Sequence, residues 1–125
     1  MKRVAIHNLD QPLTSPLQAL YCDTFFCRLR GLTFRRNIQP GHGLLLVQSR
    51  DSRMDASIHM LGVFMDLAII WVNNAGQVVD ICLARRWRLA YLPKHAARYI
   101  LELNPSRISE FHVGDRVRFE DYQSA

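Results

Sequence analysis

The chain contains little lysine, few cysteines and no long apolar segment. Only 2 of its 16 basic side chains are lysines, and its 3 cysteines are too few, and odd in number, for a disulfide framework. The most apolar window, Met60 to Val72, contains Asp66 and is shorter than the roughly 18 residues that a membrane-spanning helix needs. No charged segment followed by an apolar one opens the chain. We therefore expect a soluble, cytoplasmic protein without a membrane span.

The cysteines do not form a pattern typical of metal binding. Cys22 and Cys27 have no second pair of ligands that would complete a zinc site, and Cys82 stands alone in the sequence. Free cysteine is among the most buried residue types in proteins. We therefore expect three buried apolar thiols, and we expect no metal and no other cofactor.

The composition is that of an ordinary globular protein. Of the 125 residues, 49% are hydrophobic and 22% are charged, which excludes disordered, collagen-like and coiled-coil classes. The length fits a single domain, residues 1–125. The net charge of +5 comes from 14 arginines, many of them in two groups at 28–36 and 85–88 that are interleaved with apolar residues. Arginine suits carboxylates and phosphates, but a solvated basic surface explains this dispersed pattern without an anionic partner or a nucleic acid.

Short apolar or alternating segments predict a mainly β protein. The expected strands cover residues 3–7, 17–22, 44–47, 67–72, 77–83, 98–103 and 116–120. Residues 73–76, Asn-Asn-Ala-Gly, tolerate positive φ and predict a hairpin turn between the fourth and fifth strands. In the sixth strand, Tyr99, Leu101 and Leu103 should share one face, and Arg98, Ile100 and Glu102 the other. The pattern predicts a compact antiparallel sandwich or small barrel.

One short α-helix completes the predicted elements. Asp23 or Thr24 supplies an N-cap oxygen, and Gly31 is placed to end the helix in a left-handed conformation. The spacing of the apolar side chains between these ends is that of one helical face. These side chains are Phe25, Leu29 and Leu32.

Several short motifs follow one another in a recognisable order. They are Arg28-Leu29-Arg30-Gly31-Leu32 with Phe34-Arg35, a glycine-rich turn at 41–43, Ile58-His59, Trp87-Arg88, Leu101-Glu102-Leu103 and Gly114-Asp115. With this order and spacing the chain resembles the bacterial domain-of-unknown-function family 192, also called uncharacterised protein family 0127, over residues 3–120. The resemblance implies a compact, mostly β domain with a short helix, and it implies no known activity.

The chain departs from the family pattern at the start of the central strand. The family usually has an Asp there, two residues after a Pro, and an ungapped match places Ala68 and Asp66 at those two positions. The Thr that follows the family's His is Met60 here. A family site built on that Asp and Thr would therefore be lost or remodelled in this chain.

His59 is the leading candidate for a binding residue, because it is a polar side chain within an apolar segment. Arg30 and Arg35 bracket the end of the expected helix, and they would form an anion site if the helix packs beside His59. With Asp66 these residues make up the predicted ligand-binding set. We hypothesise a non-enzymatic module that binds an anionic small molecule or a protein partner in a cleft near His59. The helix that carries Arg28 and Arg30 would be one wall of that cleft.

Two alternatives belong to other classes of protein. A metal-dependent or hydrolytic enzyme would combine His59 with Asp66, His42 or His112. The chain has no G-x-S-x-G nucleophile motif and no phosphate-binding glycine loop, so we assign no catalytic residue and no metal ligand. A nucleic-acid-associated protein would use the arginines, and it predicts an affinity for oligonucleotides that falls steeply with salt.

Overall fold

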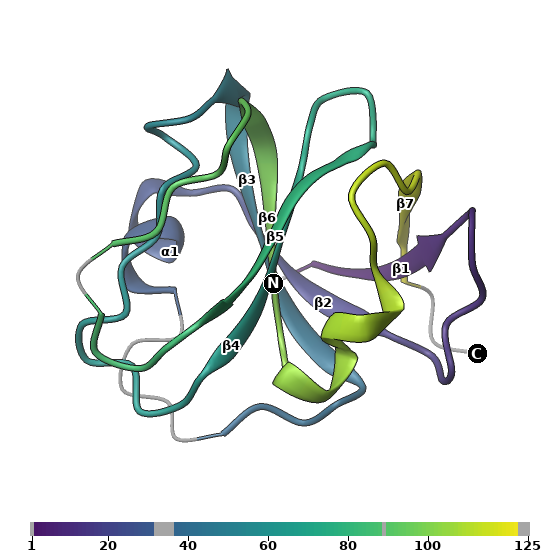
Figure 1. Cartoon of the computed structure of the whole chain (residues 1–125), viewed down its shortest axis with the longest axis horizontal. Helices are drawn as coiled ribbons and strands as arrows, with labels where there is room; N and C mark the ends of the chain where they lie inside the picture. Colours follow the sequence, from purple (N-terminus) through teal and green to yellow (C-terminus); the bar gives the residue numbers. More distant parts are fainter. Residues whose placement is uncertain (1, 32–36, 89, 123–125) are drawn as a thin grey trace.

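Seven strands form one curled sheet, a half-barrel, with very little helix (Figure 1). The computed structural model describes residues 2–31, 37–88 and 90–122, and only the backbone at positions 26, 29 and 30. Neither helix in these ranges is long and apolar enough to cross a membrane. The strands are β1 (Arg3–Asn8), β2 (Gln18–Cys22), β3 (His42–Ser52), β4 (Leu67–Val72), β5 (Val78–Ala84), β6 (Ala97–Leu103) and β7 (Val117–Asp121). The α-helix α1 (Phe25–Arg30) and the 3₁₀-helix η1 (Pro105–Glu110) complete the fold.

The strand order across the sheet is β5-β4-β6-β3-β2-β1-β7, and one pair of neighbours is parallel. β2 and β3 run in the same direction, with Gln18 opposite His42, whereas the other neighbours are antiparallel. A parallel pair needs a crossover connection, and the segment that contains α1 provides it. The expected mainly β fold with one short α-helix is confirmed. The parallel pair is the exception to the expected antiparallel arrangement, and the half-barrel corresponds to the small barrel rather than to a sandwich of two sheets.

Apolar side chains cover both faces of the sheet, because successive residues of a strand point to opposite faces. Leu45 and Leu101 belong to the core cluster on the face where η1 packs, which we name the η1-side core. Leu44 and Ile100 belong to the cluster on the other face, beside α1, which we name the α1-side core. β6 lies between β3 and β4 in the middle of the sheet. It therefore contributes buried side chains to both cores.

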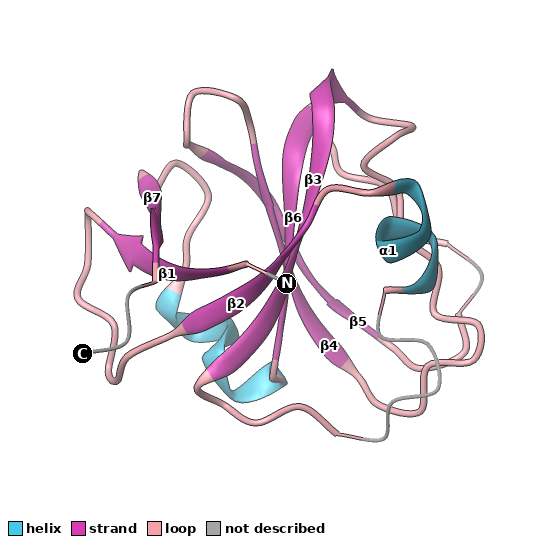
Figure 2. Cartoon of the chain, turned by 180° about the vertical axis from the view of Figure 1, so that it is seen from behind, coloured by secondary structure: helices cyan, strands magenta, loops and turns pink. Residues whose placement is uncertain are grey.

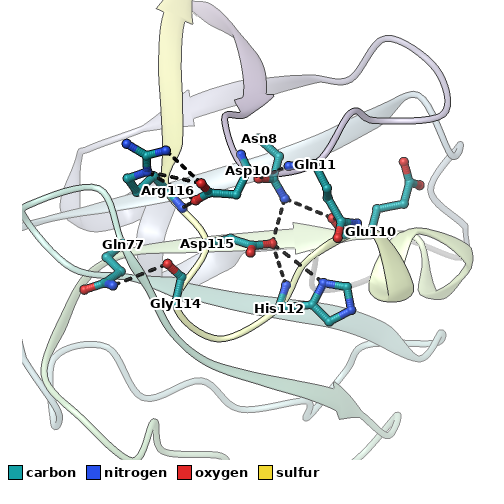
Figure 3. Close-up of polar contacts among 9 residues, drawn as sticks. All are labelled: Asn8, Asp10, Gln11, Gln77, Glu110, His112, Gly114, Asp115 and Arg116. Carbon is teal, nitrogen blue, oxygen red and sulfur yellow. Dashed lines mark hydrogen bonds and ion pairs between the residues drawn. The ribbon is translucent and has the colours of Figure 1, made fainter.

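A polar network joins the ends of β1 and β7 (Figure 3). Asn8 donates through Nδ2 to Oδ2 of Asp115 at 2.8 Å, and Nη2 of Arg116 binds Oδ1 of Asp10 at 2.8 Å. The side-chain hydrogen bond from Arg116, its largest cause, lowers the pKa of Asp10. Gln77 forms a β-bridge with Arg116, so the network also reaches the beginning of β5. Because these polar groups bind one another, we assign the network to the fold.

The 3₁₀-helix η1 was not predicted from the sequence. Asn104 caps it, and Arg107 and Glu110 form an ion pair with 2.6 Å between Nε and Oε2. Both side chains are buried, and the guanidinium also donates to the hydroxyl and carbonyl oxygens of Ser15. The ion pair and these bonds connect η1 to the loop between β1 and β2, a long-range contact that no local sequence pattern reveals.

The expectation of three buried thiols is wrong, because Cys22 and Cys27 form a disulfide. Cys22 ends β2 and Cys27 lies in α1, and the turn into the helix brings their Cα atoms to 5.6 Å, within the range that a disulfide requires. Cys82 on β5 is the free cysteine. The disulfide therefore ties α1 directly to the sheet.

Reduction of the Cys22–Cys27 disulfide should lower the free energy of unfolding by about 2 kcal/mol, because the cross-link restricts a short loop of the unfolded chain. Urea unfolding with and without a phosphine reductant measures this change. A thiol titration of the denatured, unreduced protein should detect Cys82 alone. Three reactive thiols, or an unfolding midpoint that the reductant does not move, would contradict the assignment. The Cys82→Ala variant is the control and should respond to the reductant as the wild type does.

Candidate functional site

The α1 side of the sheet contains a cleft of about 410 Å³, within the size range of small-ligand sites. β3, β4 and β6 form its floor, α1 forms one wall, and residues 55–63 form the other. Figure 2 shows α1 beside the connecting loops at one edge of the molecule. The lining combines apolar side chains, among them Leu46, Leu67 and Ile100 on the floor, with polar ones. Among the described residues it includes four charged or titratable side chains, which are Arg28, Asp55, His59 and Glu102.

Glu102 lies on β6, where its neighbours in the sheet are apolar. The residues opposite it are Leu44 on β3 and Ile69 on β4, and both belong to the α1-side core. Only 5% of Glu102 is exposed, and its Oε1 has no hydrogen-bond partner among the residues that the structure describes. A buried polar atom without a partner costs roughly 1–3 kcal/mol, and more when the group is charged. Such an atom in the lining of a cleft is a candidate ligand contact.

Burial raises the pKa of Glu102 from its usual value of 4.5 to about 7. The cause is desolvation, because apolar surroundings disfavour the ionised carboxylate. Near neutral pH the carboxyl group is therefore divided between its two forms. The neutral form donates an O–H and the ionised form only accepts, so a ligand bound at this group would change its protonation.

Local capping fixes the position of the α1 wall. Thr24 is the N-cap, and its side chain accepts a hydrogen bond from the backbone N–H of Cys27 at 3.2 Å. Gly31 follows the helix with a φ of 51°, in the region that favours glycine, so both predicted ends of the helix are confirmed. A Cβ at Gly31 would lie 3.8 Å from Oε1 of Glu102, so the end of the helix comes close to the buried carboxyl group.

Arg28 connects the same wall to the sheet. Its Nη1 donates to the backbone carbonyl of Asp23 at 2.6 Å and to that of Val47 at 3.1 Å. A guanidinium group has five N–H donors, so these two bonds leave donors for other acceptors. Arg28 therefore holds the wall in place and also offers positive charge to the cleft.

Backbone contacts hold the opposite wall, residues 55–63. Ile58 forms a β-bridge with Tyr91, and the backbone N–H of Met60 donates to the carbonyl of Arg88 at 3.0 Å. Ile58 and Met60 are buried, whereas His59 between them is exposed and lines the cleft. The apolar residues on either side of His59 in the sequence are thus buried beneath this wall and hold it on the protein, while His59 itself faces the cleft.

The structure brings one of the four predicted ligand-binding residues into the described lining, namely His59. Arg30 is the last residue of α1, but its side chain lies outside the described part of the structure. Arg35 lies outside the described residues altogether. The structure therefore gives the position of the helix end that carries Arg30, but not the contacts of either arginine.

Asp66, the fourth predicted residue, does not line the cleft. Its carboxylate binds the guanidinium groups of Arg85 and Arg86, each at 3.3 Å. The hydrogen bond from the backbone N–H of Arg86 is the largest cause that lowers the pKa of Asp66. Ala68, at the position of the family's usual Asp, is fully buried in the η1-side core, on the other face of the sheet. An Asp at that position would therefore not face the cleft.

Glu102 was not predicted as a site residue. Its position in strand 98–103 placed it on the same face as Arg98 and Ile100, opposite the face of Tyr99, Leu101 and Leu103. In the structure α1 and residues 55–63 cover the second half of that face, so Ile100 and Glu102 are both buried. The signal in the sequence was the motif Leu101-Glu102-Leu103, in which an acid follows three apolar residues of a strand.

The described residues contain no group of three or more His, Cys, Asp or Glu side chains that could hold a metal ion. Within the cleft lining, the side chains that could ligate one are His59, Asp55 and Glu102, and they are not grouped in this way. What the cleft does combine is an imidazole, a guanidinium and a buried carboxyl group around an aliphatic floor. This combination is suited to binding a small molecule that has both polar and apolar parts.

Comparisons with known sequences agree with the resemblance seen in the motifs. A model of the DUF192 family, described as "Uncharacterized ACR, COG1430", matches residues 6–119. A UPF0127 protein of Thermococcus kodakarensis is 44% identical over 97 residues, which cover 76% of this chain and 60% of that protein. A UPF0127 protein of Pyrococcus furiosus is 37% identical over 108 residues, which cover 82% of this chain and 87% of that protein.

Some of these relatives are longer than this chain, and the relatives named here come from archaea. The chain spans 60% of the length of the Thermococcus kodakarensis protein, and 50% of a UPF0127 protein of Thermococcus gammatolerans that is 44% identical over 80 residues. The relatives named here are archaeal, so the description of the family as bacterial is not supported.

Two solved structures share the fold. A Sinorhizobium meliloti protein, described as a proposed transcription regulator, has a TM-score of 0.80 at 20% identity, with 94% of this chain and 92% of that chain covered. A protein of unknown function from Novosphingobium aromaticivorans has a TM-score of 0.78 at 19% identity, with 93% and 83% covered. At these identities the similarity shows the fold alone.

The substitution Glu102→Gln should remove a pH dependence from the stability of the protein. The pKa of Glu102 is about 7 in the folded state against 4.5 when exposed, so between these values only the folded state holds the proton. The free energy of unfolding therefore falls as the pH rises through this window, by about 3 kcal/mol for this group. Glu102→Gln should lack this fall and gain stability relative to the wild type as the pH rises.

Urea unfolding of both proteins at several pH values between about 4 and about 8 measures the difference. Asp55→Asn, at the exposed rim of the same cleft, is the matched control and should keep the wild-type pH profile. If the free energy of unfolding depends on pH in the same way for the wild type and for Glu102→Gln, Glu102 does not have the raised pKa of a buried carboxyl group.

Proposed function

We propose that this chain, which belongs to the DUF192 family of uncharacterised proteins, is a non-enzymatic module that binds a small ligand in the cleft between α1 and residues 55–63. The observation that carries the proposal is the buried Oε1 of Glu102, which has no hydrogen-bond partner among the described residues of the protein. A ligand that supplies this partner would offset the desolvation of the carboxyl group. His59 at the rim is the second proposed contact.

The lining supports a particular ligand chemistry. The aliphatic floor favours an apolar body that fits in about 410 Å³. Glu102 favours an N–H or O–H donor at the inner end of the ligand. The guanidinium of Arg28 favours a carboxylate, a phosphate or another acceptor at the opposite wall. We therefore propose a small anionic ligand that also carries a donor group.

We propose Arg30 and Arg35 as further contacts of the anionic group. The reason is that Gly31, which directly follows α1, lies close to the carboxyl group of Glu102. Asp66 has the least support of the four residues proposed from the sequence, since two arginines outside the lining already bind its carboxylate. Arg30→Gln and Arg35→Gln, measured beside Glu102→Gln, test whether either arginine contributes to binding.

Native mass spectrometry of the tag-free protein, gently desalted, is the first experiment. It should show a stoichiometric additional mass in the wild type, or a ligand should emerge from a thermal-shift screen of small carboxylates and phosphates. Glu102→Gln should weaken the binding of that ligand by about tenfold or more, because a hydrogen bond to a buried charged group is lost. A ligand donor favours the ionised carboxylate, so binding should also strengthen as the pH rises through about 7.

Asp55→Asn is again the matched control, because it changes a carboxylate in the same lining at an exposed position. It should alter the affinity much less than Glu102→Gln and should keep the pH dependence. If Glu102→Gln binds the ligand with wild-type affinity and the same pH dependence, the proposal fails.

A metal-dependent or hydrolytic enzyme that uses His59 is the alternative. What favours it is that an imidazole and a carboxyl group of raised pKa line one cleft, which is the composition of a general acid–base site. Turnover of a panel of esters and phosphate esters, together with metal analysis of the tag-free protein, distinguishes the two functions. If the protein is such an enzyme, the wild type should turn over a substrate and His59→Ala should not. If it is a binding module, neither protein should show turnover.

Nucleic acid is a third class of partner. The 14 arginines favour it, and one protein of the same fold is described as a proposed transcription regulator. Neither observation identifies a surface. A surface for nucleic acid has to combine exposed arginines with an exposed aromatic ring or a basic groove.

We propose a cytoplasmic location, as the sequence led us to expect, and the disulfide provides the test. Disulfides are rare in the cytosol except in hyperthermophiles. Alkylation of thiols in intact cells before lysis shows the state of Cys22 and Cys27 where the protein resides. Cell fractionation in the same experiment shows whether the protein co-purifies with cytosolic markers or with exported proteins, and the second outcome would contradict the proposed location.

A further inference from the structure

The turn that follows β5 presents an indole ring among three arginines. Trp87 is 51% exposed, and Arg85, Arg86 and Arg88 beside it are exposed as well. None of these four residues belongs to the described lining of the ligand cleft. The turn is therefore a separate surface, and its role does not depend on the ligand proposed for the cleft.

The backbone of Trp87 has a conformation that favours glycine. Its φ is 66°, and among the described residues it alone combines a positive φ with a side chain. Trp87 is the third residue of a turn in which the N–H of Arg88 donates to the carbonyl of Arg85 at 3.4 Å. Turns with positive φ at this position usually carry Gly or Asn there, so a tryptophan costs stability. A strained backbone that carries a half-exposed aromatic side chain makes Trp87 a candidate binding residue.

Hydrogen bonds hold the backbone of the turn in place. The N–H of Trp87 donates to the carbonyl of Met60 at 2.9 Å, and the N–H of Arg85 donates to the hydroxyl oxygen of Tyr91 at 2.8 Å. Both partners lie on other segments of the chain, so the turn is fastened from two sides. The indole is therefore presented in a fixed position before any partner arrives, which reduces the entropy that binding would lose.

The side chains of the turn are ordered as well. The carboxylate of Asp66 accepts from the backbone N–H of Arg86 at 2.9 Å and pairs with the guanidinium groups of Arg85 and Arg86. The ring of Phe64 meets the indole at 78°, with 5.4 Å between the ring centroids. One carboxylate against three arginines leaves the turn with an excess of positive charge around a supported aromatic ring.

We propose that this turn is a contact surface for single-stranded nucleic acid, in which one base stacks on the indole of Trp87 and adjacent phosphates bind the flanking arginines. A polynucleotide repeats a flat ring and a negative charge in every unit, which matches the combination at the turn. An acidic peptide offers the charge but not a ring at each repeat. The net charge of +5 also favours a polyanion such as single-stranded nucleic acid over a cationic or neutral partner.

Fluorescence anisotropy with labelled oligothymidylate and oligouridylate tests the proposal. Trp87→Asn removes the indole but keeps a residue that tolerates positive φ, so it should fold with a melting temperature near that of the wild type. It should weaken binding at least about fivefold, since stacking of one base is lost. Trp87→Tyr keeps an aromatic ring and should bind almost as the wild type does. The affinity should fall with salt with a logarithmic slope of roughly −2, as expected for three phosphate contacts on a single strand.

Matched controls separate this turn from the rest of the basic surface. Arg88→Gln should weaken binding and reduce the salt slope, whereas Arg50→Gln, at an exposed position on β3, should change neither. Heparin and polyglutamate supply charge without bases, and their binding should not respond to Trp87→Asn. The proposal is overturned if neither oligonucleotide binds, if Trp87→Asn binds as the wild type does, or if polyglutamate binds as tightly as the oligonucleotides.

Discussion

Burial of β6 on both faces is the constraint on which the other features of this protein depend. β6 pairs with β3 and β4, and Leu101 and Ile100 enter opposite cores of the molecule. Glu102 follows on the same face as Ile100, so its carboxyl group sits among the side chains of the α1-side core. Desolvation then raises its pKa to about 7 and leaves Oε1 without a partner in the described chain. An apolar floor with one buried acid is the direct consequence.

The walls above that floor are connections rather than strands. The parallel pairing of β2 and β3 requires a crossover, and the crossover brings α1 to the face that contains Glu102. The disulfide between Cys22 and Cys27 and the bonds of Arg28 to backbone carbonyls then restrict its position. The other wall belongs to the connection between β3 and β4, which is anchored where the indole of Trp71 donates to a backbone carbonyl at 2.8 Å. Two walls that are anchored separately leave a cleft between them.

Local signals in the sequence predicted the elements well. The alternating and apolar runs predicted six of the strands to within one residue at each end, and the hairpin of β4 and β5 turns at the expected Asn-Asn-Ala-Gly segment. The strand expected at 44–47 was too short, since β3 extends from His42 to Ser52. Thr24 and Gly31 bound the helix as capping rules require. His59 drew attention in the sequence because an isolated polar side chain between apolar neighbours is a local feature, and the structure places it in the lining of the cleft. In the sequence, the turn at Trp87 was visible only as a short basic and aromatic motif. Residue types do not reveal that the backbone of Trp87 has a positive φ.

Most of the features that were missed depend on contacts between distant segments. Arg98 and Glu102 lie on the same face of β6, yet the guanidinium of Arg98 reaches the carbonyl of Gln48 and the side chain of Asn74 near the surface. Glu102, four residues later, lies beneath α1 and the 55–63 wall. Alternation alone assigns both to one face of the strand, and it carries no information on what covers that face. The parallel pair was missed for the same reason, since it follows from the crossover. The disulfide is different, because it joins cysteines only five positions apart, and it was missed because an odd number of cysteines does not suggest a disulfide framework.

Glu102 is a buried carboxyl group whose Oε1 has no hydrogen-bond partner among the residues that the structure describes. The most direct test is a carbon-13 NMR titration of the glutamate carboxyl resonances, with the Glu102 signal assigned by its loss in Glu102→Gln. We expect a midpoint near 7 for this signal in the free protein. A midpoint near 4.5, the usual value for an exposed glutamate, would show that the carboxyl group is not desolvated as described.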